Sequence, residues 1–126
     1  MQYAGLTKEI ISCALKVHRT LGPGFLESVY GKAMAHELGK AGLQVVRQRA
    51  VKVVYDGVVV GDFVADMLVE ETVMVEIKAV QMLGRAHEVQ LVNYLSATGI
   101  EIGLLLNFGS HSLQVKRKYR TFQGQD

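Results

Sequence analysis

Hydrophobic positions recur at helical spacing in the first part of the chain. After Thr7, which we expect to cap the first helix, apolar residues return every three or four positions as far as residue 21. The glycine- and proline-containing segment 21–24 ends this helix, because glycine favours left-handed caps and proline cannot continue the hydrogen-bond ladder. A second helix is predicted over residues 26–38, so the chain opens with two helices.

From residue 43 onwards the period of the hydrophobic pattern changes to two. Asp56-Gly57 is a strong hairpin signal, and Gly99 closes a third helix predicted over residues 85–98. Strands are predicted at residues 45–49, 51–55, 58–69, 73–80, 102–107 and 113–119. This order indicates a mixed sheet flanked by helices in one domain over residues 1–122, followed by a disordered tail at 123–126.

Two acidic residues and one lysine interrupt two of the apolar strands. If residues 70–72 form a three-residue loop, Asp66 lies opposite Glu76 on the neighbouring antiparallel strand, with Cβ atoms ~4.5–5.5 Å apart. Lys78 follows Glu76 by two positions, so strand alternation places both side chains on one face. A two-residue turn would instead shift the register by one residue and send the two carboxylates to opposite faces.

This carboxylate pair needs a physical cause, because like charges directly opposite each other destabilise a sheet. A hard divalent cation such as Mg²⁺ prefers oxygen ligands and would offset the repulsion. Lys78 could then orient a water molecule or stabilise charge on a phosphate. The alternative without a metal is a salt bridge between Glu76 and Lys78 at an open sheet edge, with Asp66 solvated at the end of its strand.

Composition adds only broad limits. The chain has 126 residues, 49% of them hydrophobic, which fits one domain. No apolar run approaches the ~20 residues of a membrane span and no secretory leader pattern opens the sequence, so we expect a cytoplasmic protein without a membrane partner. The only cysteine, Cys13, excludes an internal disulfide. Basic clusters at 47–52 and 116–120 could follow a phosphate backbone or simply form a solvated edge that prevents aggregation.

Two motifs carry a resemblance to a known family. Asp66 followed by Glu76-Ile77-Lys78 resembles the D…(D/E)-x-K signature of the PD-(D/E)XK nuclease superfamily. Upstream, residues 24–30 (GFLESVY) are similar to the G-x-x-E-x-x-Y motif of the small bacterial GxxExxY proteins. Ala65 replaces the proline that usually precedes the first acid, a departure that many superfamily members share. The resemblance covers roughly residues 5–120.

The resemblance implies an α/β fold with a restriction-endonuclease-like (PD-(D/E)XK) core, in which α-helices flank a mixed central β-sheet. It also implies Mg²⁺ or Mn²⁺ as a cofactor and DNA or RNA as a partner. The site residues that it implies are the catalytic Lys78, Glu27 and Gln90 and the metal ligands Asp66, Glu76 and the backbone carbonyl of Ile77.

Two classes of function follow from these observations. The first is metal-dependent hydrolysis of phosphodiester bonds in DNA or RNA. The second is a nuclease-like fold that binds nucleic acid or a protein without cleaving anything. The presence of every expected acidic and lysine position favours the enzyme, whereas the small size of the chain indicates that a homodimer or a protein partner supplies specificity. A redox or small-molecule enzyme finds no support, because no glycine-rich phosphate loop follows a strand.

Overall fold

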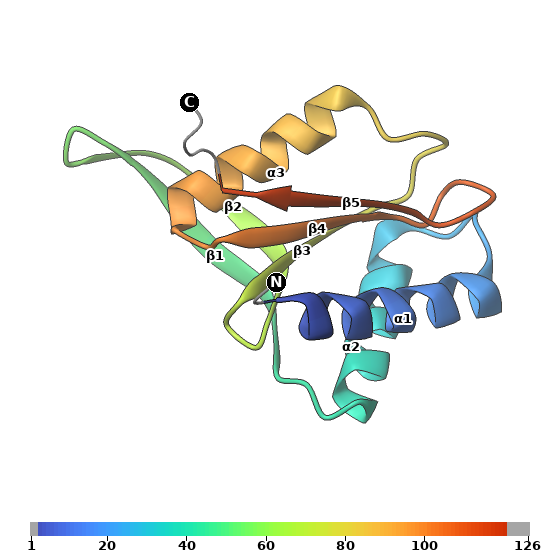
Figure 1. The fold of residues 1–126 in the computed structure, drawn as a ribbon. Coiled ribbons are helices and arrows are strands. Elements are labelled where there is room, and N and C mark those ends of the chain that lie inside the picture. The colour runs from blue at the N-terminus through green and yellow to red at the C-terminus, as the bar shows by residue number, and fades with distance from the viewer. Residues whose placement is uncertain (1–2, 121–126) are drawn as a thin grey trace.

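The computed structural model describes residues 3–120, which form three layers with a sheet between helices (Figure 1). The strand order is β1-β2-β3-β4-β5. The β3–β4 pair is parallel, and the other three pairs are antiparallel. The elements in chain order are α1 (Ala4–Leu21), α2 (Glu27–Lys40), β1 (Val45–Tyr55), β2 (Val58–Val69), β3 (Val73–Lys78), α3 (Arg85–Thr98), β4 (Ile102–Asn107) and β5 (Gln114–Tyr119). The tail expected at 123–126 lies outside the described residues.

Two hydrophobic cores lie on opposite faces of the sheet. The larger core joins α1 and α2 to one face, and its members include Ile10, Met34 and Val75. The smaller core joins α3 to the other face through Leu91 and Leu95. Strands β3 and β4 are covered on both sides, which is why their sequences are apolar without alternation. The arrangement confirms the predicted α/β fold with helices on both faces of a mixed sheet.

Several predicted elements agree closely with the structure. The third helix and the strand at residues 102–107 have the predicted bounds. Gly99 adopts the left-handed conformation expected of a C-cap. The turn at Asp56-Gly57 joins β1 to β2 with Tyr55 opposite Val58, as the hairpin signal indicated.

Several predicted boundaries were wrong: the strands predicted at 45–49 and 51–55 form the single strand β1, α2 spans residues 27–40 rather than 26–38, and β5 begins at residue 114 rather than 113. Two further corrections have a visible cause. Helix α1 begins at Ala4 rather than after Thr7, and the Thr7 hydroxyl donates to backbone carbonyls of the preceding turn instead of capping the helix. Strand β3 ends at Lys78 rather than at residue 80, because the side chain of Asn107 takes over the backbone groups of Val80. Both corrections involve polar side chains that replace the partners a regular element would provide.

No helix within residues 3–120 is long and apolar enough to cross a membrane.

Candidate active site

The loop between β2 and β3 has the three residues that the sequence predicted. Val69 pairs with Val73 and Met67 with Val75, and the paired residues end there. In this register the next two residues, Asp66 and Glu76, lie opposite each other. The predicted juxtaposition of the two acids is therefore confirmed, and it falls at the point where the regular β2–β3 ladder stops.

The two carboxylates replace the backbone hydrogen bonds of that ladder. The backbone N–H of Asp66 donates to Glu76 Oε2 at 3.0 Å, and the N–H of Ile77 donates to Asp66 Oδ2 at 2.7 Å. The second oxygen of each carboxylate accepts no hydrogen bond from residues 3–120. Every side-chain nitrogen or oxygen in this range that is fully shielded from solvent has a hydrogen-bond partner. Those two oxygens are consequently open to solvent or to a ligand.

The β1–β2 pair is irregular at the same level. Gln48 has a φ of 55°, and the pairing of β1 with β2 skips the position where Gln48 would face Asp66. Ala65 and Leu68, three residues apart, both join the core on the α3 side, so strand alternation is interrupted between them. Asp66 therefore lies where β2 loses its regular pairing with both neighbours, which opens the sheet at the carboxylates.

The carboxylate pair is costly to ionise fully. Burial raises the pKa of Glu76 from its ordinary value of 4.5 to about 7, and the charge of Asp66 adds to the rise. Burial also raises the pKa of Asp66, against the opposing effects of the Ile77 N–H and the charges of Lys78 and Arg47. Near neutral pH the pair carries less than two full negative charges, and a divalent cation would relieve its repulsion.

The salt bridge at an open edge, the alternative without a metal, does not form. Strand β3 lies between β2 and β4 instead of at an edge, and Glu76 is 94% buried, with only 6% of its surface exposed. Within residues 3–120, no ion pair joins Glu76 to Lys78. Lys78 is half-buried and follows Glu76 by two strand positions, as predicted.

The segment Asn107-Phe108-Gly109 clamps the end of β3. The buried Asn107 accepts from the N–H of Val80 and donates to its carbonyl, both at 2.9 Å, while the Phe108 N–H donates to the Lys78 carbonyl. A Cβ atom at Gly109 would lie 2.4 Å from the Val80 nitrogen, so only glycine fits there. The clamp therefore fixes the backbone that follows Glu76 and Lys78.

The G-x-x-E-x-x-Y motif forms a structural lock at the start of α2. The Tyr30 hydroxyl donates to the Gly22 carbonyl at 2.5 Å and accepts from the Phe25 N–H at 3.1 Å. Tyr30 is completely buried and stacks on Phe108. Gly24 has a φ of 113°, a conformation that side chains rarely allow. The lock sets the position of α2, of which Glu27 is the first residue.

Glu27 and Asp66 line one pocket of about 190 Å³, together with Arg47 and Ile77. Glu27 is exposed, and its charge adds to the raised pKa of Glu76, after the larger effects of burial and of Asp66. The structure thus brings Glu27 to the same pocket as Asp66 from nearly 40 positions away. Its predicted catalytic role stays a prediction.

An aromatic pair packs against the smaller core on the α3 side of the sheet. Tyr94 stacks on Phe63 with a centroid distance of 3.7 Å. Burial raises the pKa of Tyr94, and the charges of Glu76 and Asp66 raise it further. Gln90 is exposed one helical turn earlier, and within residues 3–120 it makes no hydrogen bond to either acid. Its role also stays a prediction.

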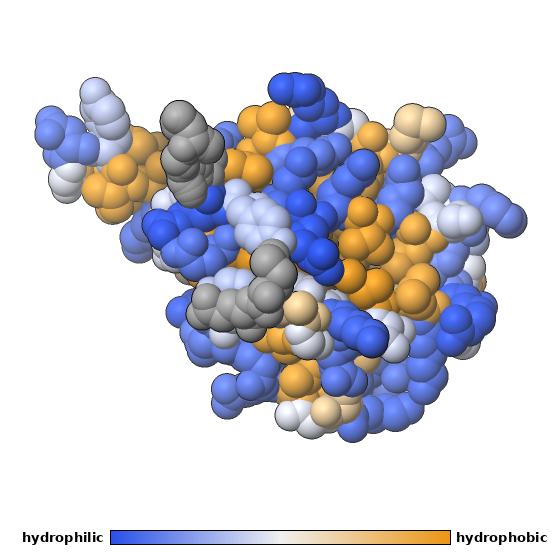
Figure 2. Space-filling view, in the orientation of Figure 1, coloured by the Kyte–Doolittle hydropathy of each residue, from blue (hydrophilic) through white to orange (hydrophobic). Residues whose placement is uncertain are grey.

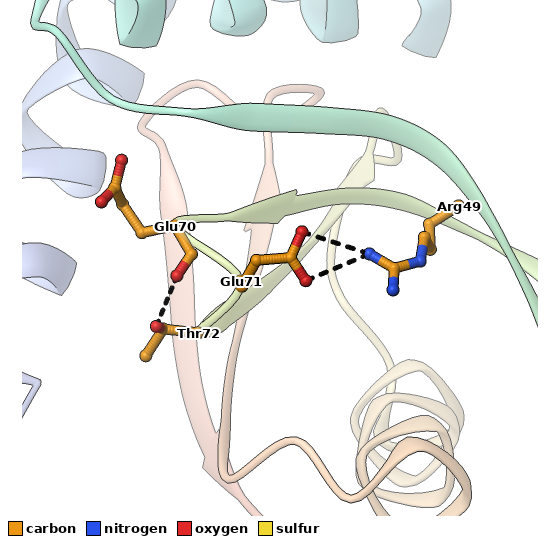
Figure 3. Close-up of polar contacts among 4 residues, drawn as sticks. All are labelled: Arg49, Glu70, Glu71 and Thr72. Atoms are coloured by element: carbon orange, nitrogen blue, oxygen red, sulfur yellow. Dashed lines mark hydrogen bonds and ion pairs between the residues drawn. The ribbon is translucent and has the colours of Figure 1, made fainter.

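Most of the basic side chains considered as phosphate contacts are engaged elsewhere. Arg49 pairs with Glu71 at 3.3 Å (Figure 3), and Lys118 pairs with Glu88 at 2.6 Å. Arg47, two positions from Arg49 on β1, makes no ion pair with any residue in 3–120 and lines the pocket beside Asp66. The irregularity at Gln48 explains why these two arginines reach different pockets.

Comparison with protein families gives the same assignment as this geometry. The family model of the PD-(D/E)XK nuclease superfamily matches residues 4–119. The chain belongs to the PD-(D/E)XK nuclease superfamily. The match extends from the first residue of α1 to the last residue of β5 and confirms the predicted fold class. Comparisons with curated proteins and with solved structures find no significant match.

The residues present suit the divalent metal that PD-(D/E)XK nucleases usually employ. Within residues 3–120, no three acidic, histidine or cysteine side chains are grouped closely enough to hold an ion by themselves. Mg²⁺, however, is often held by only one or two carboxylates and completes its shell with water and substrate phosphates. The two solvent-open oxygens of Asp66 and Glu76 supply that donor set.

Two residues of this PD-(D/E)XK site were not assigned to it from the sequence. Arg47 was considered only as part of a basic cluster, because a regular strand would have placed it and Arg49 on the same face. Tyr94 follows Gln90 by four residues, and this helical spacing is the signal that could have assigned it to the site.

Proposed function

We propose that this PD-(D/E)XK protein is a nuclease that uses Mg²⁺ or Mn²⁺ to hydrolyse phosphodiester bonds in DNA or RNA. The observation that carries the proposal is the pair formed by the buried Glu76 and the half-buried Asp66 where β2 and β3 separate. A pair of repelling carboxylates with raised pKa values weakens the fold, so its presence is best explained by a cation that compensates it.

Three residues of the site would bind the metal ion and a fourth would act on the substrate. The open oxygens of Asp66 and Glu76, with the carbonyl of Ile77, would hold the ion. When bound, the ion would polarise the phosphate and lower the pKa of an attacking water. The ammonium of Lys78 would stabilise the negative charge that grows on the phosphate in the transition state.

Substrate binding would use the pocket between α2 and β1. Arg47 has no ion-pair partner within residues 3–120, and its guanidinium lies over Gly31 of α2, 3.4 Å from where a Cβ atom would be. Guanidinium groups bind phosphate oxygens in bidentate fashion. We therefore assign Arg47 to a non-bridging phosphate oxygen, with Glu27 and Gln90 completing the polar surroundings of the metal and substrate.

The finer family assignment also belongs to the proposal. The hydrogen bonds of Tyr30 to Gly22 and Phe25 and the positive φ of Gly24 give a physical reason for two of the three motif positions, and Glu27 at the pocket gives one for the third. This supports membership of the GxxExxY proteins. A cytoplasmic location, one domain over residues 1–122 and a homodimer or protein partner are retained as predictions.

A second candidate is a nuclease-like protein that binds nucleic acid without cleaving it. The observation that favours this alternative is that no group of three metal-binding side chains is present within residues 3–120. Such a protein would bind DNA or RNA with an affinity that falls steeply with salt concentration, because phosphate contacts release counterions. Its binding would not depend on Asp66 and Glu76.

The deciding experiment is a cleavage assay with single- and double-stranded DNA and RNA in Mg²⁺, Mn²⁺ or EDTA. We expect cleavage with either metal, none in EDTA, and none by the double variant Asp66→Ala/Glu76→Ala. Calorimetry should show that the same variant no longer binds Mn²⁺ while circular dichroism shows it folded. Metal-dependent cleavage that survives in the double variant would refute the proposed site. Salt-dependent binding without cleavage would decide for the second candidate.

A further inference from the structure

The outer half of the β1–β2 hairpin projects beyond both helical layers (Figure 1). It exposes five large apolar side chains, and Figure 2 shows apolar surface where the hairpin leaves the body. Their exposed fractions range from 52% to 72%, and they are Val54, Tyr55, Val58, Val59 and Val60. None of the five belongs to either hydrophobic core.

This ribbon is apolar on both of its faces. Tyr55 faces Val58 across the hairpin, and Val54 faces Val59. Neighbouring positions of a strand point to opposite faces, so each face presents one of these cross-strand pairs. A two-stranded ribbon by itself is only marginally stable in water, and exposed apolar patches of this kind mark interaction surfaces.

The free edge of β1 identifies the form that a partner would take. Strand β1 is at the end of the sheet order, so one side of its backbone has no strand beside it. Edge strands are commonly protected by charged side chains, but the three residues after Lys52 are Val53, Val54 and Tyr55. Such an edge is suited to pairing with another strand through backbone hydrogen bonds.

The charges at this edge are complementary to those of a second copy. The run from Lys52 to Asp56 places a positive charge at one end, a negative charge at the other, and three apolar residues between. Asp56 is the first residue of the β1–β2 turn, with a φ of 54°, so in an antiparallel pair centred on Val54 each Lys52 reaches the Asp56 carboxylate of the second copy where the paired strands end. The same register places Val54 opposite itself and Val53 opposite Tyr55.

We propose that two copies of this chain form a symmetric dimer by antiparallel pairing of β1 with β1 around Val54. The pairing joins the two five-stranded sheets into one and places the two apolar ribbons side by side in it. It is independent of the proposed nuclease activity, since none of its residues lines the pocket beside Asp66.

A cross-linking experiment tests the register directly. Opposite residues in an antiparallel pair have Cα atoms about 4.5–5.5 Å apart, within the roughly 4.4–6.8 Å that a disulfide spans. Val54→Cys should therefore form a covalent dimer under mild oxidation. Val59→Cys is the matched control, because this valine is similarly exposed but lies one strand inward, about 14 Å from its symmetry mate at ~4.8 Å per strand. The native thiol, Cys13, is buried and should not react.

A charge-exchange experiment tests the same pairing without cross-linking. Lys52→Glu and Asp56→Lys each place like charges opposite one another in a homodimer, which should weaken it roughly tenfold or more. An equimolar mixture of the two variants restores both attractive pairs, so it should dimerise like the native chain. Masses measured by sedimentation should then be twice 13.9 kDa for the native chain and the mixture, and should shift towards 13.9 kDa for each variant alone.

Three outcomes would overturn the proposal. They are a native mass of 13.9 kDa up to high micromolar concentration, equal cross-linking of Val54→Cys and Val59→Cys, and failure of the mixed variants to associate more strongly than either variant alone.

Discussion

Replacing Glu76 by glutamine should stabilise the metal-free protein while removing its response to metal. The Glu76 side chain is 94% buried and faces Asp66, and its pKa is raised from 4.5 to about 7. Glutamine has nearly the same size and can still accept the hydrogen bond from the Asp66 N–H. It carries no charge to desolvate or to repel Asp66.

The magnitude of this effect follows from linkage between protonation and folding. Below pH 4.5 the carboxyl is protonated in both the folded and the unfolded chain, so it imposes no penalty. Between pH 4.5 and about 7 the unfolded chain releases the proton first, and the free energy of unfolding falls as the pH rises. Since a tenfold change in an ionisation constant is worth about 1.4 kcal/mol, the full penalty above pH 7 is about 3 kcal/mol.

The assay is urea unfolding followed by circular dichroism in EDTA at pH 4.5 and pH 8.5. Glu76→Gln should be more stable than the native chain by up to about 3 kcal/mol at pH 8.5 and by little at pH 4.5. Added Mg²⁺ should raise the melting temperature of the native chain only. Glu88→Gln is the control: its ion pair with Lys118 lowers the pKa of Glu88, so its loss should bring no gain at pH 8.5. A Glu76→Gln variant no more stable than the native chain at pH 8.5, or equally stabilised at both pH values, would refute the reasoning.

Three further predictions concern the residues around this pair. Lys78→Ala should lower kcat about 10²- to 10³-fold while calorimetry shows unchanged Mn²⁺ affinity, because the ammonium acts on the transition state; a parallel loss of metal binding would contradict this role. Arg47→Gln should weaken binding of a labelled oligonucleotide by about tenfold in a fluorescence anisotropy titration, whereas Arg49→Gln should change it little, because Arg49 is already paired with Glu71. Glu27→Gln should weaken metal binding or cleavage and leave the stability without metal within ~0.5 kcal/mol, since Glu27 is exposed; unchanged metal affinity and rate would make it a surface residue only.

The elements that the sequence predicted well are those with strong local signals. Helix α3 could be placed to the residue because a left-handed glycine follows its last turn. The opposition of Asp66 and Glu76 was predicted for a three-residue loop between β2 and β3, and the structure has that loop rather than the two-residue alternative. In both cases the information is held within a short stretch of chain.

The features that could not be predicted depend on contacts between distant segments. Nothing in the sequence around Gln48 predicts a positive φ, yet this conformation makes the side chains of Arg47 and Arg49 line different pockets. Tyr30 is fully buried because it stacks on Phe108, far along the chain, while its hydroxyl finds partners in the loop before α2. Such contacts between distant segments are decided by tertiary packing and leave no periodicity in the sequence.

The polar clamp at the end of β4 explains how the fold can hold so unfavourable a pair. The β1–β2 and β2–β3 pairs are both irregular at Asp66, and the carboxylates of Asp66 and Glu76 accept hydrogen bonds from backbone N–H groups there. The sheet is therefore weakest at the proposed active site. On the other side of β3, the parallel pairing with β4 continues unbroken to Lys78 opposite Asn107. The Asn107 amide then fastens Val80 by accepting from its N–H and donating to its carbonyl, and it accepts a third hydrogen bond from the Gly109 N–H, while Gly109 approaches the Val80 backbone closely. The strain of the site is thus confined to the β2 side, while β4 keeps Glu76 and Lys78 in fixed positions. A site whose geometry is set before its ligand binds requires such rigid support.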